Sequence, residues 1–381
     1  MSIPIPYDIL RLIWWALLGV LLIGFAVLDG YDLGTAMLLP FVARTDAERR
    51  QVRETIEPNW EGHQVWLVVG AGASFAAWPL LYAASFSGFY VAMLLVLATL
   101  ILRPVGFNFR DKLESQGWRR FWDRVLAIAG FVPSLVFGVA FGNLLLGVPF
   151  GFDSEMRLSY AGTVLDLLNP FGLLAGLVSV AMLAMHGGAW LALKADGVVA
   201  ERASRIGRLA GLATAVLFAL AGLWIAFGIE GYVISGAISH TGPSNPLAKS
   251  VTREAGGWLR NYGIHSWLIA APLLGIVAPI LSAASSRPRG SIAALVCSGL
   301  GIAGIVATAG VSLFPFLLPS STHPEASLTV WDSSSSPMTL FIMLIAVLVL
   351  LPAVLIYTSF AMRVMRGRVH LADVERRSSH Y

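Results

Sequence analysis

Long apolar segments separated by short polar ones dominate the chain. A helix needs about 20 mostly apolar residues to cross a bilayer, and about nine segments meet that length. They are predicted at Arg11–Leu39, Gly62–Tyr82, Phe86–Leu102, Val125–Leu146, Phe171–Leu193, Ile206–Ile229, Ile264–Leu281, Ile292–Leu317 and Met338–Met362. The pattern therefore predicts an all-α integral membrane protein in which the whole chain, 1–381, forms a single polytopic membrane domain.

The second segment is the weakest of these, because Pro79 and several small residues interrupt it. Omitting it would leave eight helices and a long polar loop. Basic residues decide between the two counts, since short cytoplasmic loops are enriched in Lys and Arg. Such residues alternate regularly between loops, beginning with Arg44, Arg49, Arg50 and Arg53, only if the second segment spans. Nine helices, a periplasmic N-terminus and a cytoplasmic C-terminus are therefore predicted.

Eight of the helices can be grouped into two four-helix bundles, predicted over residues 8–150 and 165–320. The last helix and its cytoplasmic tail, predicted over residues 336–365, then form a peripheral helix outside the two bundles. The longer loops lie on the outer side and are rich in Gly, Pro, Ser and Asn, which is typical of irregular structure. These loops are Phe150–Asn169, Gly231–Asn261 and Leu318–Pro337.

Composition supports a membrane location. Of 381 residues, 57% are hydrophobic and only 13% are charged, whereas a soluble domain carries about 25% charged residues. The net charge of +4 does not indicate nucleic-acid binding, because the basic residues follow the alternation of the loops. The single cysteine, Cys297, excludes an intramolecular disulfide and a metal site built of cysteines. No cleavable signal pattern is present, so the first helix is expected to be retained.

Three acidic residues lie on or beside the first two predicted helices. Asp29 and Asp32 are three residues apart and therefore share one helix face. Glu61 starts the second helix, between Trp60 and Trp66. Ionisable side chains at membrane depth are costly and usually mark a proton path, an ion site or a cofactor. Two plainer interpretations stay open: headgroups could solvate the Asp pair, and the helix dipole alone could explain Glu61.

Three further side chains extend this set. Arg103 ends the third helix, where it either snorkels to the interface or pairs with one of the three acids. His63 is interpreted equally well as a surface residue or as a member of a proton relay. His186 lies mid-helix and raises the idea of heme ligation. Since the sequence offers it no partner ligand on a facing segment, a hydrogen-bonded interior histidine is favoured.

Several sequence runs follow one another in order over nearly the whole chain. They are Trp14-Trp15, Gly24–Gly34, Trp60–Trp66, Phe75–Pro79, Phe86–Tyr90, Arg103–Phe107, Gly138–Asn143, Asn169–Gly176, Gly228–Tyr232 and Phe314–Phe316. Together they resemble subunit II of the cytochrome bd quinol oxidases, a family that includes the cyanide-insensitive oxidases.

The resemblance implies a terminal respiratory oxidase of the bacterial cytoplasmic (inner) membrane. Such an enzyme oxidises quinol, reduces O2 to water and generates a proton gradient without pumping. Subunit I carries two b hemes and heme d, whereas subunit II carries no heme, supports subunit I and contributes to proton or oxygen access. A structural quinone in this chain and a small single-helix accessory subunit are both compatible with the resemblance.

We expect assembly with subunit I through the acid-bearing helices. The expected proton-pathway residues are Glu61, Asp29, Asp32 and Arg103, and the residues expected at an oxygen passage or interface are Trp66 and Trp60. Some relatives have Asp where this chain has Asn108, so proton uptake at that position is in doubt here. The alternative function is a secondary transporter with intramembrane carboxylates, which the lack of clear inverted repeats disfavours.

Overall fold

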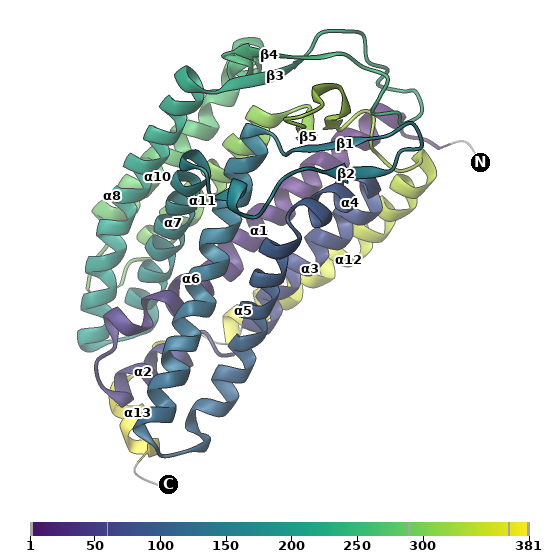
Figure 1. Cartoon of the computed structure of the whole chain (residues 1–381). Helices are drawn as coiled ribbons and strands as arrows, with labels where there is room; N and C mark the ends of the chain where they lie inside the picture. The colour runs from purple at the N-terminus through teal and green to yellow at the C-terminus, as the bar shows by residue number, and fades with distance from the viewer. Residues whose placement is uncertain (1–2, 59, 289, 365, 379–381) are drawn as a thin grey trace.

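The structure, a computed structural model, describes residues 3–58, 60–288, 290–364 and 366–378 and is mainly helical (Figure 1). Within these residues, eight helices are long and apolar enough to cross a membrane. They are α1 (Tyr7–Val42), α5 (Tyr90–Phe109), α6 (Gln116–Leu146), α7 (Pro170–Lys194), α8 (Gly197–Gly228), α10 (Ala270–Ser285) continued from the 3-10 turn η4 (Ser266–Ile269), α11 (Ile292–Leu313) and α12 (Pro337–Val364). The predicted fold class is confirmed.

The second predicted span exists as a broken helix. α3 (Trp60–Ala77) ends before Trp78, and α4 (Pro79–Gly88) begins directly after it. Proline suits the first position of a helix, and because it lacks an amide hydrogen it removes a backbone hydrogen bond from a helix that would continue through it. Together α3 and α4 run alongside α1 (Figure 1). The expected count of about nine is therefore reached with eight regular helices and one broken crossing.

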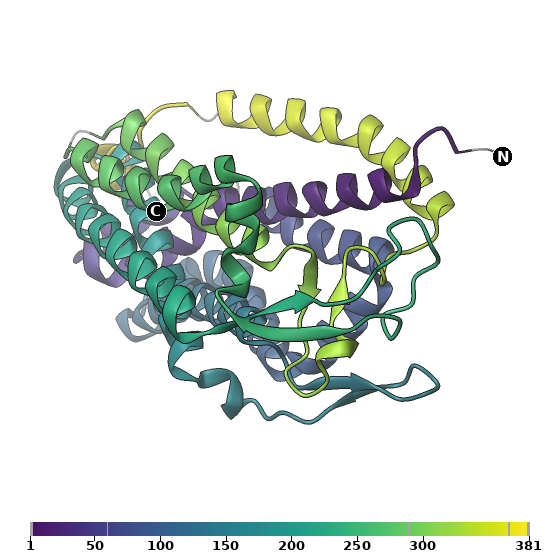
Figure 2. The same cartoon turned by 90° about the horizontal axis from the view of Figure 1, so that it is seen from above.

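The two ends of the bundle carry different structures. One end, here called the arginine-rich end, holds α2 (Asp46–Glu54), the 3-10 turn η1 (Arg110–Lys112) and α13 (Leu371–Ser378) (Figure 1). The other end, here called the sheet end, holds the described part of the N-terminus and all the strands. α12 lies at the edge of the bundle beside α1 (Figure 2), in keeping with its predicted peripheral place.

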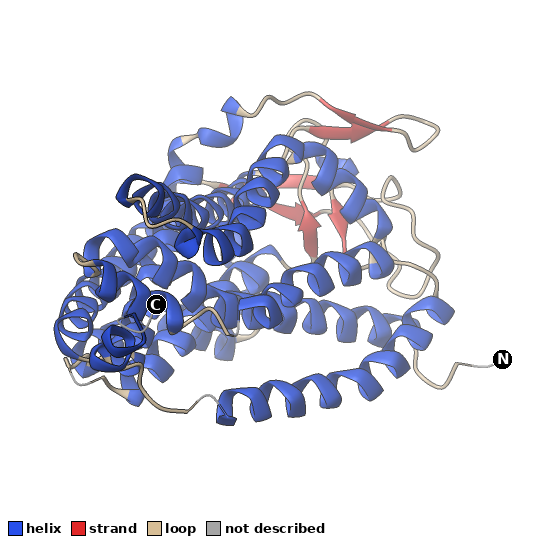
Figure 3. Cartoon of the chain, turned by 90° about the horizontal axis from the view of Figure 1, so that it is seen from below, coloured by secondary structure: helices blue, strands red, loops and turns tan. Residues whose placement is uncertain are grey.

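The sheet end is built of three two-stranded antiparallel sheets, drawn in red in Figure 3. The prediction of irregular loops is wrong for these segments, because pairing satisfies backbone groups that a loop would leave to solvent. The strands are β1 (Phe150–Phe152) with β2 (Leu158–Tyr160), β3 (Glu230–Ile234) with β4 (Val251–Ala255), and β5 (Phe316–Leu318) with β6 (Leu328–Thr329). Short helical turns accompany the strands: η2 (Leu165–Leu168) follows β2, and η5 (Pro324–Ala326) lies between β5 and β6. Three more follow β4, namely η3 (Gly257–Leu259), α9 (Arg260–Ile264) and η4 (Ser266–Ile269).

α1 occupies the middle of the bundle and contacts α3, α6, α7, α11 and α12. Glycine allows the closest of these approaches: a Cβ on Gly34 of α1 would lie 2.0 Å from the carbonyl oxygen of Leu183 on α7. Small residues let transmembrane backbones touch in this way. Because α6 and α7 also pack against each other, the division into bundles at 8–150 and 165–320 stays a prediction.

Candidate functional site

The first buried acid of α1 is paired with an arginine. Asp29 accepts two hydrogen bonds from Arg103 of α5, with Nη1 at 3.1 Å from Oδ2 and Nη2 at 2.9 Å from Oδ1. Both side chains are buried, so a bidentate, charge-neutral pair lies in the apolar interior. Pairing of Arg103 with an acid is confirmed. The alternatives, a snorkelling Arg103 and an Asp29 solvated by headgroups, are wrong.

The second buried acid is paired with a histidine. Asp32 lies one helical turn after Asp29, and its Oδ2 is 2.7 Å from Nδ1 of His63 on α3. The other imidazole nitrogen, Nε2, lies 3.3 Å from the hydroxyl of Tyr31. Oδ1 of Asp32 has no hydrogen-bond partner among the described residues. His63, which the sequence left open between surface and interior, is therefore an interior residue.

Glu61 lies apart from this cluster. Its side chain is exposed, and it makes no hydrogen bond or ion pair within the part of the chain that the structure describes. Residues two positions apart on an α-helix are about 200° apart around its axis. Glu61 and His63 therefore point to opposite sides of α3. The inner side of the helix start is taken by His63, so Glu61 does not contact the aspartates, and its part in a proton pathway stays a prediction.

Aromatic rings close the interior site. The Tyr31 ring stacks on Trp190 of α7, with centroids 4.0 Å apart. Trp190 donates its Nε1 hydrogen to the carbonyl of Thr55 at 3.3 Å, and the Tyr31 hydroxyl also lies 3.9 Å from Sδ of Met362 on α12. The sequence analysis missed Tyr31 as a site residue. Its place between two acids in the run Asp29–Asp32 was the available signal.

The two tryptophans that flank Glu61 in sequence are both buried. Trp60 packs against Phe107 of α5, with ring centroids 5.8 Å apart. The ring of Trp66 occupies the space that a Cβ on Gly24 of α1 would need. Both side chains fill helix contacts, and a passage along them stays a prediction.

His186 joins three helices through its ring. Nε2 lies 3.0 Å from the carbonyl oxygen of Val27 on α1, and Nδ1 lies 2.7 Å from Oγ of Ser298 on α11. A carbonyl only accepts, so Nε2 carries the hydrogen and Nδ1 accepts from Ser298. Both nitrogens are thereby engaged, which confirms the hydrogen-bonded interior histidine. Within the described ranges, no group of three or more His, Cys, Asp or Glu could hold a metal ion.

A cavity of about 720 Å³ lies beside the acid cluster, where α1, α6 and α7 face α8, α10 and α11. Its lining is almost wholly apolar. The polar exceptions include the hydroxyls of Tyr262 and Ser312, which lie 2.9 Å apart. Gly30, which is the neighbour of Asp29, also lines the cavity, as does Leu67 next to Trp66.

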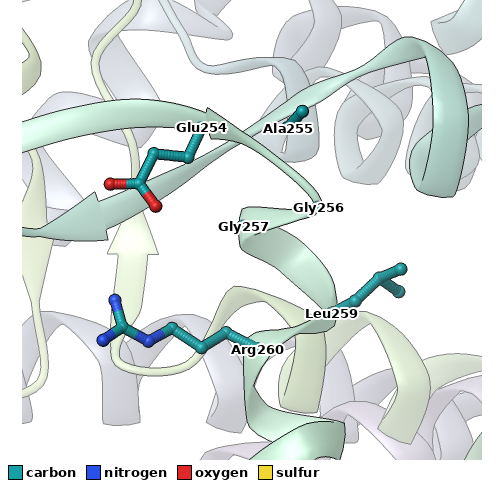
Figure 4. Close-up of a pocket in the computed structure, with 6 residues that line it drawn as sticks. All are labelled: Glu254, Ala255, Gly256, Gly257, Leu259 and Arg260. Atoms are coloured by element: carbon teal, nitrogen blue, oxygen red, sulfur yellow. The ribbon is translucent and has the colours of Figure 1, made fainter.

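A second hollow, of about 470 Å³, lies at the sheet end after β4. The side chains of Glu254 and Arg260 extend on one side of the turn at Gly256, and Leu259 points to the other side (Figure 4). Both charged side chains are exposed.

The arginine-rich end is held by a network of ion pairs. The guanidinium of Arg110 bonds to Asp46 at 2.6 Å, to Asp111 at 2.8 Å and to Asp123 at 2.6 Å. Burial alone would raise the pKa of Asp46, but the hydrogen bond and charge of Arg110 hold it below its ordinary value. Asn108 is exposed near this network and donates to the carbonyl of Pro104 at 3.0 Å.

Known proteins similar to this chain share one description. A family model described as cytochrome bd terminal oxidase subunit II matches residues 10–365. The chain is 51% identical over 372 residues to cytochrome bd-I ubiquinol oxidase subunit 2 of Escherichia coli (strain K12), with 98% of both chains covered. It is 31% identical to cytochrome bd ubiquinol oxidase subunit 2 of Bacillus subtilis (strain 168), covering 94% of this chain and 96% of that one.

A solved structure supports the fold alone. The bd oxidase from Geobacillus thermodenitrificans superposes with a TM-score of 0.69 at 15% identity, covering 93% of this chain and 98% of the other.

Proposed function

The chain belongs to the cytochrome bd terminal oxidase subunit II family, and we propose that it is the subunit of a quinol:O2 oxidoreductase that supports the heme-bearing subunit I. The observation that carries this proposal is a buried, charge-balanced polar cluster around α1. Ionisable groups of this kind can carry protons. We place two b hemes and heme d in subunit I, and the engagement of both nitrogens of His186 in hydrogen bonds supports this placement.

The visible spectrum tests this assignment. The chain is purified alone and together with the products of its neighbouring genes. Heme absorbance and quinol-dependent O2 consumption are expected only in the complex. Solute transport by the lone chain, without heme in the complex, would favour the secondary transporter. Family membership already weighs against that alternative.

We place the contact with subunit I on the outer side of α3. Glu61 is exposed there, next to the exposed apolar side chains of Val65 and Val68. A carboxylate seldom faces lipid near membrane depth, so a protein surface with a hydrogen-bond donor is the fitting neighbour. A lipid surface would suit the valines but leave the acid without a partner.

In this assembly, Glu61 takes protons at the subunit interface, while Asp29, Asp32 and Arg103 form the interior part of the pathway. Glu61→Gln keeps the size of the side chain but cannot titrate. Quinol-driven O2 consumption is expected to fall at least tenfold, about 1.4 kcal/mol of barrier, with heme content unchanged. Glu61→Asp should retain much of the rate. Full activity of Glu61→Gln at every pH would leave the proton path to subunit I.

We also propose that Trp66 and Trp60 border an apolar route for O2 on the inner side of α3. Leu67, the neighbour of Trp66, already lines the 720 Å³ cavity.

The same cavity is the proposed place for a structural quinone. Apolar walls suit an isoprenoid chain, and the Tyr262–Ser312 hydroxyl pair supplies hydrogen bonds to a ring carbonyl. Ala219→Phe narrows the cavity, whereas Leu220→Phe on the exposed side of the same helix does not. Mass spectrometry of solvent extracts should find less quinone per heme in the first variant only. Equal quinone in both variants would contradict this placement.

We propose that the arginine-rich end faces the cytoplasm, because basic loops are retained there. Reporter fusions after Arg53 and after Arg368 should both report cytoplasm. A periplasmic signal after Arg53 alone would contradict this orientation.

A further inference from the structure

The imidazole of His63 lies between two groups of different hydrogen-bonding capacity. On one side, the carboxylate oxygen of Asp32 is 2.7 Å from Nδ1. On the other side, the hydroxyl of Tyr31 is 3.3 Å from Nε2. An ionised carboxylate only accepts, whereas a phenolic hydroxyl both donates and accepts. The question is therefore whether both ring nitrogens of His63 have hydrogen-bond partners in more than one protonation state.

Both protonation states of His63 find complete partners. In the neutral ring, Nδ1 donates to Asp32, and Nε2 accepts from the Tyr31 hydroxyl. In the imidazolium, Nε2 donates to the Tyr31 oxygen instead. The hydroxyl hydrogen can then turn toward Sδ of Met362, 3.9 Å away, which is a weak acceptor. A proton can thus be added or removed without leaving a buried donor unpaired.

The charges around His63 and Asp32 indicate that an extra proton would reside on this pair. Asp29 and Arg103 neutralise each other through two hydrogen bonds. The other ionisable group of α3 nearby, Glu61, faces away from the interior. Among these groups, His63 and Asp32 are consequently the ones whose charge is not already neutralised by a residue of a neighbouring helix. Both are buried, so a net charge on this pair is costly.

We infer that His63 and Asp32 form one proton-carrying pair inside this chain, with His63 as the positioning residue through which Asp32 is loaded. The inference rests on the proposed function and deepens its proton pathway. In the transfer, the Nδ1–H bond of the imidazolium breaks and an O–H bond forms on Oδ2 of Asp32. An ion pair becomes a neutral pair, and no oxidant or reductant is involved. The neutral ring keeps its hydrogen on Nε2 after this step, so it returns to the Nδ1–H tautomer before Nε2 takes the next proton from the Tyr31 side.

The free oxygen of Asp32 gives the transfer a direction. Oδ1 is buried and has no hydrogen-bond partner among the described residues, although buried polar atoms are nearly always bonded. Rotation of the carboxyl group carries the proton from the His63 side to this open side. Tyr31 and His63 therefore supply the proton. After rotation, Oδ2–H occupies the open side that Oδ1 held before, and the proton leaves the pair from there.

The test is the pH profile of quinol-driven O2 consumption by the complete two-subunit enzyme. His63→Asn places an amide donor near the position of Nδ1 and cannot titrate. We expect the pH of half-maximal rate to shift by about one unit or more, with heme content unchanged. Asp32→Asn and Tyr31→Phe should displace the same inflection. His186→Gln is the matched control, since it changes a buried histidine bonded to groups that do not ionise, and its profile should equal that of the wild type.

The outcomes separate the two proposals. A wild-type complex without quinol-dependent O2 consumption would refute the proposed function itself. An active wild type whose profile is unchanged in His63→Asn would refute only the proton-carrying pair. If His63→Asn, Asp32→Asn and Tyr31→Phe all fail to assemble while His186→Gln assembles, the pair is structural and the inference is likewise overturned.

Discussion

Two buried histidines, His63 and His186, lie near Tyr31, with ring centroids 5.1 and 6.0 Å from its ring, and differ in their contacts. His63 contacts a carboxylate and a hydroxyl, whereas His186 contacts a backbone carbonyl and a serine. The surroundings of His63 provide hydrogen-bond partners for both the neutral and the protonated ring. Those of His186 fix one tautomer, because the Val27 carbonyl can only accept from Nε2. Burial alone is therefore a poor guide to function in this chain, and the chemistry of the two contacts is what separates them.

The surroundings of the two rings differ in the same way. Beside His63 lie Asp32, Asp29 and Arg103, whose charges compensate one another. The direct hydrogen-bond partners of His186 carry no charge. We expect the first region to depend on keeping its charges paired, and the second to depend on packing and neutral hydrogen bonds. The predictions below test this difference.

The largest effect is expected from unpairing the charges. Arg103→Leu leaves the buried Asp29 carboxylate without its partner, which costs about 3–5 kcal/mol. The yield of assembled complex and its thermal unfolding midpoint should both fall sharply. Replacing Asp29 as well, in the double variant Asp29→Leu with Arg103→Leu, should recover most of that stability. Equal losses of stability in the single and double variants would show that the unpaired Asp29 charge is not the cause of the destabilisation.

Substitution of Gly34 tests the close contact between α1 and α7, which joins the two regions. A Cβ there would lie 2.0 Å from the Leu183 carbonyl and 3.0 Å from Cα of Gly187. Gly34→Ala therefore forces α1 and α7 apart and should cost about 3 kcal/mol, the upper part of the range for overpacking. Tyr31 and Trp190 stack across the same contact, so their packing is disturbed too. Gly62→Ala, with open space around its Cβ, is the control and should leave the unfolding midpoint in place.

His186→Ala should weaken the structure without touching the cofactors. It removes two buried hydrogen bonds and opens a small void, for a loss of about 2 kcal/mol. The heme spectrum of the assembled complex should be unchanged. Loss of one heme band from a complex that still assembles would contradict the neutral, structural assignment of His186.

The smallest effect belongs to a surface acid. Since Arg110 and its neighbours lower the pKa of Asp46 despite partial burial, its contribution is present above the ordinary Asp pKa and is lost as the pH falls through the lowered value. Asp46 is partly exposed, so the contribution should be under about 1 kcal/mol. Asp46→Asn should thus lower the stability of the complex slightly near neutral pH, and the difference from the wild type should vanish in strong acid, where Asp46 is protonated. A difference that persists in strong acid would show that the charge of Asp46 is not what stabilises this network.

Much of the fold is predictable from the sequence because the bilayer sets the length of each apolar segment. The spacing of Asp29 and Asp32 correctly indicated one helix face, and Arg103 was a correct partner. The short helix α2 was not predicted, although Thr45 and Glu48 form a capping box at its start. The paired strands of the sheet end depend on contacts between residues distant in sequence.

The two sides of α3 could not be assigned from the sequence. In a soluble protein the polar side of a helix faces water, but here both sides of α3 are largely apolar, and either could meet lipid, a partner or the interior. The sequence therefore favoured Glu61 as the inner acid, and packing placed His63 there instead. Trp66 against Gly24 fixes that rotation of α3, a contact that no local pattern reveals.

The most direct test of the account is an infrared difference spectrum of the two-subunit enzyme, labelled with ring-13C histidine and titrated through neutral pH. Wild type and His186→Gln should show the same linked imidazole and carboxyl bands, and His63→Asn should lack them. The same bands in all three proteins, or their loss in His186→Gln alone, would contradict the claim that the contacts of His63, and not those of His186, make a proton-carrying site.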